Sequence, residues 1–201
     1  MNHSRLMAFL RRRRRSIVIA FLAAVIFSPL GLDGCWSAAR AWTLFRHPEP
    51  DAFLILGGYM ARVEGAVRMP DVRASAAPIY YSSGTPGHIP LFEDAGISAD
   101  RVIVDTRARD TLTNFTTLVD EFRRRRFRHI RIITCAGHLR RARAIARVVL
   151  GSAGIACSTA PVSPGVIRSE PMGEAVRDYL RAWVWLATGW TGRRLPRASH
   201  R

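Results

Sequence analysis

The sequence predicts an α/β protein with a doubly wound, mostly parallel sheet and helices on both faces. From residue 51 onward, short apolar runs alternate with segments of helical periodicity. Each run is continuous rather than alternating, which is typical of strands buried on both faces of a parallel sheet. The 201 residues suit one such domain with short additions at both ends.

The N-terminal segment predicts one transmembrane helix, which we assign to residues 16–36. Residues 16–32 carry no charge, and as a helix they would be about 25 Å long. Six arginines precede this run and two follow it closely, so residues 1–15 are expected in the cytoplasm and the rest outside. The chain would then be a single-pass protein of the plasma (inner) membrane, with the lipid bilayer as one partner.

Two other interpretations of this segment remain open. The apolar run is short and small residues follow it at 37–39, as in a cleaved signal peptide. Residues 32–35 also resemble a lipoprotein cleavage box. All three interpretations export the domain, which we expect at 51–190 after a linker at 37–50 and before a disordered basic tail at 191–201.

Five strands and five helices are expected within 51–190. The strands are 52–56, 79–83, 101–105, 130–135 and 155–162. The helices are 62–73, interrupted by Pro70, and then 90–96, 112–126, 138–150 and 173–190. Asp110 or Thr111 is expected to cap the third helix. The aromatic residues of the last helix should cover the sheet or lie against the membrane.

The composition excludes several function classes. The chain has 31 basic residues, all arginine, so neither a Schiff-base lysine nor a P-loop lysine is available. Its three cysteines lack the CxxC spacing of a zinc site, and whether Cys135 and Cys157 form a disulfide is left open. The net charge of +16 suggests nucleic acid at first sight. However, residues 51–190 hold 19 arginines against 13 acids, and the run 123–126 suits a helix C-terminus, so nucleic-acid binding is disfavoured.

The candidate site lies at the ends of the expected strands. Gly57-Gly58 follows the first strand, Ser83-Gly84 the second, Asp105 ends the third, and His138 follows the fourth. Because ligands of doubly wound sheets bind outside the carboxyl ends of the strands, these residues should meet there. No metal site is expected, and the patterns GxGxxG, GxSxG and HExxH are missing from the sequence.

These residues suit an anion. Arginines could hold a phosphate or carboxylate bidentately, and the candidates are Arg62, Arg140 and Arg141. His138 and Asp105 are the candidates for proton transfer.

The order of these motifs resembles the YdcF/SanA/ElyC-like family. The resemblance covers roughly 51–162 and includes Asp110-Thr-Leu-Thr-Asn114 and the stretch 132–142. It implies a Rossmann-like domain whose polar residues line the strand ends, with no defined cofactor. The matching positions are Gly57, Gly58, Arg62, Ser83, Gly84, Asp105, Thr111, Asn114, His138 and Arg141. Thr113 stands where the family often has Glu, which argues against an acid–base role at that position.

The resemblance and the strand-end residues lead to one functional expectation. We expect a membrane-anchored cell-envelope protein that binds a phosphate-bearing ligand, either nucleotide-like or linked to a lipid carrier; whether it also turns this ligand over is left open. The alternative is a non-catalytic binding or regulatory module at the membrane. Fold transfers from such a resemblance more securely than function does.

Overall fold

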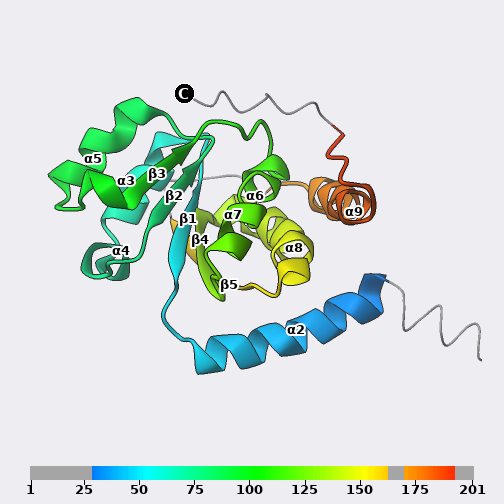
Figure 1. The fold of residues 1–201 in the computed structure, drawn as a ribbon. Coiled ribbons are helices and arrows are strands. Elements are labelled where there is room, and N and C mark those ends of the chain that lie inside the picture. The colour runs from blue at the N-terminus through cyan, green and yellow to red at the C-terminus, as the bar shows by residue number, and fades with distance from the viewer. Residues whose placement is uncertain (1–28, 163–169, 193–201) are drawn as a thin grey trace, which may run out of the picture. The chain divides into compact units, whose positions relative to one another are not determined.

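The computed structural model describes residues 29–162 and 170–192, drawn as a coloured ribbon in Figure 1. The chain divides into two compact units, Met1–Ala38 and Ala39–Arg201. All the strands of the described residues belong to the second unit.

The second unit is built on a sheet of five parallel strands. They are β1 (Ala52–Leu56), β2 (Ile79–Ser82), β3 (Val102–Asp105), β4 (His129–Cys135) and β5 (Ala156–Val162), in the order β3-β2-β1-β4-β5. The α/β class and the parallel sheet predicted from the sequence are therefore confirmed. The order matches the first five strands of doubly wound nucleotide-binding sheets, in which the ligand crevice lies where the order reverses, here between β1 and β4.

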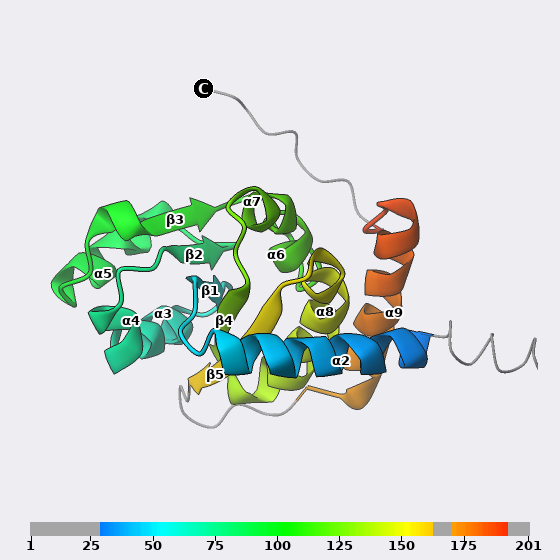
Figure 2. The same cartoon turned by 60° about the horizontal axis from the view of Figure 1, so that its bottom comes forward.

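Helices lie on both faces of the sheet (Figures 1 and 2). One face is covered by α3 (Met60–Val67), α4 (Pro70–Ala74) and α5 (Ile89–Asp94), and the other by α6 (Thr113–Thr116), α7 (Val119–Arg124) and α8 (Leu139–Val149). Successive side chains of β1 point to opposite faces of the sheet, and Phe53 and Ile55 pack with Val63 of α3. On the other face, Tyr80 of β2 meets Phe122 of α7 edge to face at 4.8 Å. Burial on both faces explains why the strands read as continuous apolar runs.

The last helix, α9 (Met172–Thr188), packs against α8, which separates it from the sheet (Figure 1). Its buried residues, Ala175, Asp178 and Ala182, form one narrow stripe. Its aromatic residues therefore do not cover the sheet, and the other expectation, that they lie against the membrane, stays a prediction. Many large apolar side chains of this helix remain exposed.

The long helix expected at 112–126 is two short helices, α6 and α7. Leu118 bonds back to the carbonyl of Phe115, three residues earlier, which tightens the chain between them. The hydroxyl of Thr117 lies 2.8 Å from the carbonyl of Thr113 and 2.6 Å from Asp105 Oδ2. Threonine hydroxyls that bond nearby backbone compete with the regular helix, which accounts for the interruption.

Helix α2 (Pro29–Arg46) runs through most of the region expected to be a linker. None of the helices within residues 29–162 and 170–192 is long and apolar enough to cross a membrane. Residues 1–28, with most of the expected transmembrane helix, lie outside the described residues, as does 193–201 of the expected tail. The membrane anchor therefore stays a prediction.

Candidate functional site

A cavity of about 410 Å³ lies at the carboxyl ends of β1, β2 and β4. Seven of the residues expected in the site line it: Gly57, Gly58, Arg62, Ser83, Thr111, Asn114 and His138. Five further residues complete the lining: Tyr59, Ala108, Arg109, Asp110 and Glu170. The position agrees with the crevice that the strand order indicates.

Gly57 allows the loop after β1 to run against the end of β2. Its N–H donates to the carbonyl of Ser82 at 2.7 Å. A Cβ at this position would lie 2.5 Å from the carbonyl oxygen of Ser83 and closer still to that of Ser82. Only glycine fits so near another backbone, so the loop can line the cavity in this position only with glycine at residue 57.

Arg62 is the buried cation of the site, with 5% of its surface exposed. Its Nη1 atom donates to the carbonyl of Leu56 at 3.0 Å and to that of Gly57, and Nε donates to Cys135 Sγ at 3.0 Å. No carboxylate among the described residues pairs with it. A buried charge without a counterion is costly, and the site retains its positive charge toward the cavity.

Asn114 supplies a second buried donor and is 6% exposed. Its Oδ1 atom accepts hydrogen bonds from the hydroxyls of Ser82 at 3.0 Å and Ser83 at 2.8 Å. These bonds belong to the amide orientation in which Oδ1 faces the two serines; Ser83 Oγ, which has a single proton, also lies 3.2 Å from the carbonyl of Ala108. The Nδ2 group is left without a partner in the part of the chain that the structure describes. The backbone of Ser83 is in the left-handed conformation, with φ at 53°, which is uncommon for a residue other than glycine.

His138 forms a hydrogen-bonded pair with Glu170. The Nδ1 atom lies 2.7 Å from Glu170 Oε1. Burial lowers the pKa of His138 below its usual value; Glu170 opposes this, while the charges of Arg62 and Arg141 add to it. The ring is therefore neutral near pH 7, and if Nδ1–H donates to the carboxylate, Nε2 is a free base at the cavity.

Asp110 lines the cavity but is engaged within the protein. Its Oδ1 atom accepts from the backbone N–H of Thr113 at 2.9 Å, and Oδ2 accepts from Arg181 at 2.8 Å. Burial raises the pKa of this carboxyl, but these bonds outweigh it and hold the pKa below its usual value. Asp110 or Thr111 was expected as the helix cap, but α6 begins at Thr113 with Leu112 in the cap position; Asp110 instead bonds the first N–H of the helix from two positions further back.

Asp105 lies outside the cavity, although we expected it beside His138. Its Oδ1 atom accepts from Arg107 Nε at 2.7 Å, and Oδ2 accepts from the hydroxyl of Thr117. The carboxylate therefore fixes the segment after β3. Gly84 does not line the cavity either. It packs against the ring of Tyr81, and a Cβ at this position would lie 2.6 Å from Cγ of that ring.

The arginines expected to flank His138 are also placed elsewhere. Arg141 pairs with Asp178 at 2.6 Å and with Glu174 at 2.8 Å, so it joins α8 to α9. Arg140 is exposed and contacts the sulfur of Met172. At the cavity their place is taken by Arg109, an exposed arginine whose guanidinium has no partner among the described residues.

Sequence reasoning therefore missed two residues, Arg109 and Glu170. Arg109 lies in the loop between Asp105 and Asp110, where its neighbours in sequence were already candidates. Glu170 is 32 positions from His138, and no spacing links the two. Within the described residues, no cluster of His, Cys, Asp and Glu could hold a metal ion.

Comparisons of the chain with family models, with curated proteins and with solved structures found no match. The similarity to the YdcF/SanA/ElyC-like family therefore stays a prediction from the motifs.

Proposed function

We propose that the cavity binds the phosphate group of an anionic ligand, either nucleotide-like or lipid-linked, in the metabolism of cell-envelope polymers. The observation that supports this most is Arg62, a buried guanidinium without a carboxylate partner in the described residues, beside the unpaired amide donor of Asn114. Two fixed donors of this kind match the oxygens of a phosphate.

Backbone donors strengthen the proposal. Gly58 and Tyr59 donate no backbone hydrogen bond among the described residues, and Tyr59 precedes α3 without a side-chain cap. The N-terminus of α3 thus presents unpaired N–H groups beside Arg62. Each carboxylate of the cavity has an arginine nearby, Arg181 at 2.8 Å from Asp110 and Arg141 at 3.6 Å from Glu170, and these arginines reduce the repulsion of an anion.

His138 is the group that would move a proton. Its neutral ring, oriented by Glu170, could accept a proton at Nε2 from a water or hydroxyl whose oxygen attacks the phosphorus of the bound group, while the bond between phosphorus and the ester oxygen breaks. The same proton would then pass from Nε2 to the leaving ester oxygen. The imidazolium that forms would be stabilised by the Glu170 carboxylate. Asp105 has no part in this step, because Arg107 and Thr117 occupy its oxygens.

Binding should be measured on the full chain by calorimetry with three probes: inorganic phosphate, AMP and dihexanoyl phosphatidic acid. Replacing Arg62 with Gln should weaken binding roughly tenfold or more, as expected for the loss of hydrogen bonds to a charged group. Arg109→Gln, at an exposed position that cannot affect folding strongly, should weaken it less. Arg73→Gln, on the exposed surface of α4, is the matched control. Wild-type affinity in both cavity variants, or no saturable binding of any probe, would overturn the proposal.

The second candidate is a binding module without turnover, and the engaged state of Asp105 and Asp110 favours it, since one proton-transfer group remains. Release of inorganic phosphate from AMP and from phosphatidic acid separates the two. An enzyme loses turnover in His138→Ala while it retains binding, whereas a binding module shows a melting shift with ligand and no product.

We also propose that residues 16–36 anchor the chain in the plasma membrane with the α/β domain outside the cytoplasm. The uncharged run and the arginines before it support this. Mass spectrometry of the natively purified protein would give its N-terminus. A start at residue 35 or later would show that the segment is cleaved.

A further inference from the structure

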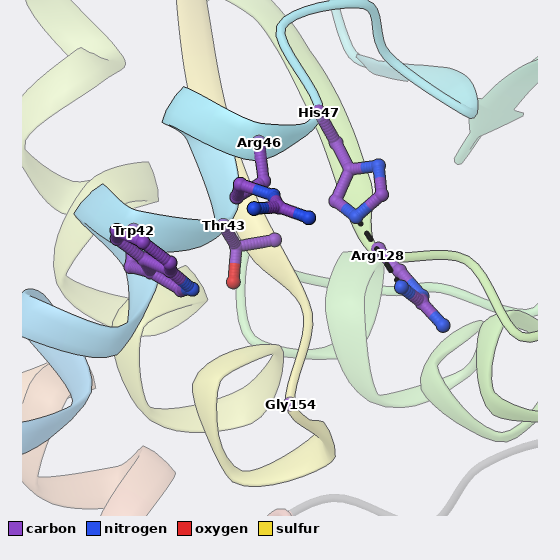
Figure 3. A pocket seen from close by; sticks show the side chains of 6 residues that line it. All are labelled: Trp42, Thr43, Arg46, His47, Arg128 and Gly154. Carbon is purple, nitrogen blue, oxygen red and sulfur yellow. Dashed lines mark hydrogen bonds between the residues drawn. The ribbon is translucent and has the colours of Figure 1, made fainter.

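We infer a second anion site, specific for phosphate groups, at the amino-terminal ends of the strands. The first cavity lies at their carboxyl ends. A surface cavity of about 480 Å³ lies there, between the last turn of α2 and the loops that precede β1, β4 and β5. Its lining consists of Trp42, Thr43, Arg46, His47, Arg128 and Gly154 (Figure 3). None of these residues is acidic.

Its cations are arranged together. Figure 3 shows Arg46 extending toward His47, whose Nε2 atom lies 3.3 Å from Nη1 of Arg128. A guanidinium can only donate, so Nε2 of His47 accepts this bond and holds the side chain of Arg128 in place. Neither arginine forms an ion pair with any of the described residues.

The frame of this cavity is fixed to the sheet. The carbonyl of His47 accepts a hydrogen bond from the Nδ1 atom of the buried His129 at 3.0 Å. Asp51 Oδ2 accepts the backbone N–H groups of Arg128 and His129, at 2.6 and 2.8 Å. This carboxylate is therefore engaged with the backbone at the start of β4, and it does not line the cavity.

The helix end does not account for two arginines. Helix α2 ends at Arg46, and its terminal carbonyls carry a partial charge of about −0.5, which favours one nearby cation. Two guanidinium groups exceed that charge several-fold. A phosphate oxygen pair would balance the remainder and match the planar donors of both arginines.

The rim of the cavity indicates where the phosphate comes from. Trp42 is 63% exposed and Phe45 is 76% exposed, with their rings 6.1 Å apart, and Arg46 stacks over Trp42 at 5.9 Å. Exposed aromatic rings beside arginines are typical of side chains that enter the headgroup layer of a bilayer. Anionic phospholipid headgroups are therefore the first candidates, and a soluble phosphate ester has the same chemistry.

The test uses the full chain in non-ionic detergent micelles and follows the indole N–H resonance of Trp42, assigned with Trp42→Phe. One arm adds sodium phosphate against sodium chloride at matched ionic strength. The other adds phosphatidylglycerol to the micelles against phosphatidylcholine. We expect a saturable shift that is roughly tenfold weaker in Arg46→Gln/Arg128→Gln. It should be unchanged in Arg68→Gln/Arg73→Gln, which removes the same charge from exposed positions elsewhere.

Each result has one meaning. Saturation by phosphate and by phosphatidylglycerol supports a general phosphate site, and saturation by phosphatidylglycerol alone supports the membrane surface as the ligand. An equal response to chloride, equal losses in the two double variants, or no saturable shift would indicate an adventitious ion only and overturn the inference. Arg62→Gln should leave the Trp42 response intact, so this test is independent of the first cavity.

Discussion

The Nδ1 atom of His138 lies 2.7 Å from the Oε1 atom of Glu170, so the turn after β4 is bonded to the residue that precedes α9 by two positions. The second carboxylate oxygen of Glu170 is buried without a hydrogen bond, 3.6 Å from Nη1 of Arg141. The pair therefore depends on two segments that are distant in the chain. It also orients the ring of the only histidine among the described residues that line the candidate site.

Replacing Glu170 with Gln should lower the pKa of His138 further. Glu170 raises that pKa through its hydrogen bond and its charge, and burial would then act unopposed. The pKa can be measured from the ring nitrogen shifts of His138 in an NMR titration. Glu93→Gln, at an exposed position on α5, should leave it unchanged. An identical titration in Glu170→Gln would show that the carboxylate does not interact with the ring in solution.

Stability should fall as the pH decreases from about 7.5 to 5.5. Burial lowers the pKa of His138 and of His129 below the 6.5 of an unfolded histidine. The unfolded chain therefore binds more protons in this window, so each histidine contributes stability that is present above pH 6.5 and lost below it. Urea unfolding at the two pH values should show the decrease, and a smaller one in His138→Asn. A midpoint that does not change with pH would contradict this.

Further acidification should remove a separate contribution from Asp110 and Asp178. For both, burial raises the pKa, but hydrogen bonds outweigh it and leave the pKa below its unfolded value of 3.8. Their contribution is complete above that value and is lost as the pH falls through the folded pKa values. Unfolding curves extended below pH 4 should therefore show a second decrease, and Asp110→Asn should reduce it.

Asp178→Asn should destabilise the protein by about 3 kcal/mol, the typical cost of breaking a buried ion pair. The side chain of Asp178 is 0% exposed and bonds Arg141 at 2.6 Å and Arg181 at 3.0 Å. Its loss leaves Arg141 on a buried surface with fewer counterions. Asp94→Asn, at an exposed position, should change stability by no more than about 0.5 kcal/mol. Equal unfolding midpoints for the two variants would contradict the prediction.

Gly57→Ala should destabilise the protein strongly, because the added Cβ would collide with the carbonyls of Ser82 and Ser83. Neither backbone segment can move without disturbing β2. Gly173→Ala, in α9, has open space around it and should stabilise by about 0.4–1 kcal/mol. Thermal unfolding measures both changes. A melting temperature of Gly57→Ala equal to that of the wild type would show that the loop after β1 is displaced in solution.

The sequence by itself determined the strands and the region of the site. Strands buried on both faces leave continuous apolar runs, and the carboxyl ends of parallel strands share one edge. Gly57, Ser83 and His138 could therefore be brought together from their positions after three runs. The same reasoning does not predict which partner each charged side chain has, because these partners come from distant parts of the chain.

Tertiary structure alone decided which charged groups face the cavity. Arg141 follows His138 closely in sequence, yet the acids of α9 turn it away, while Arg109 takes the open position. Glu170 reaches His138 because α9 packs on α8, and no local pattern predicts that packing. An ion pair forms wherever folding places opposite charges within about 4 Å. Which of the many arginines of this chain line the cavity therefore depends on the tertiary structure.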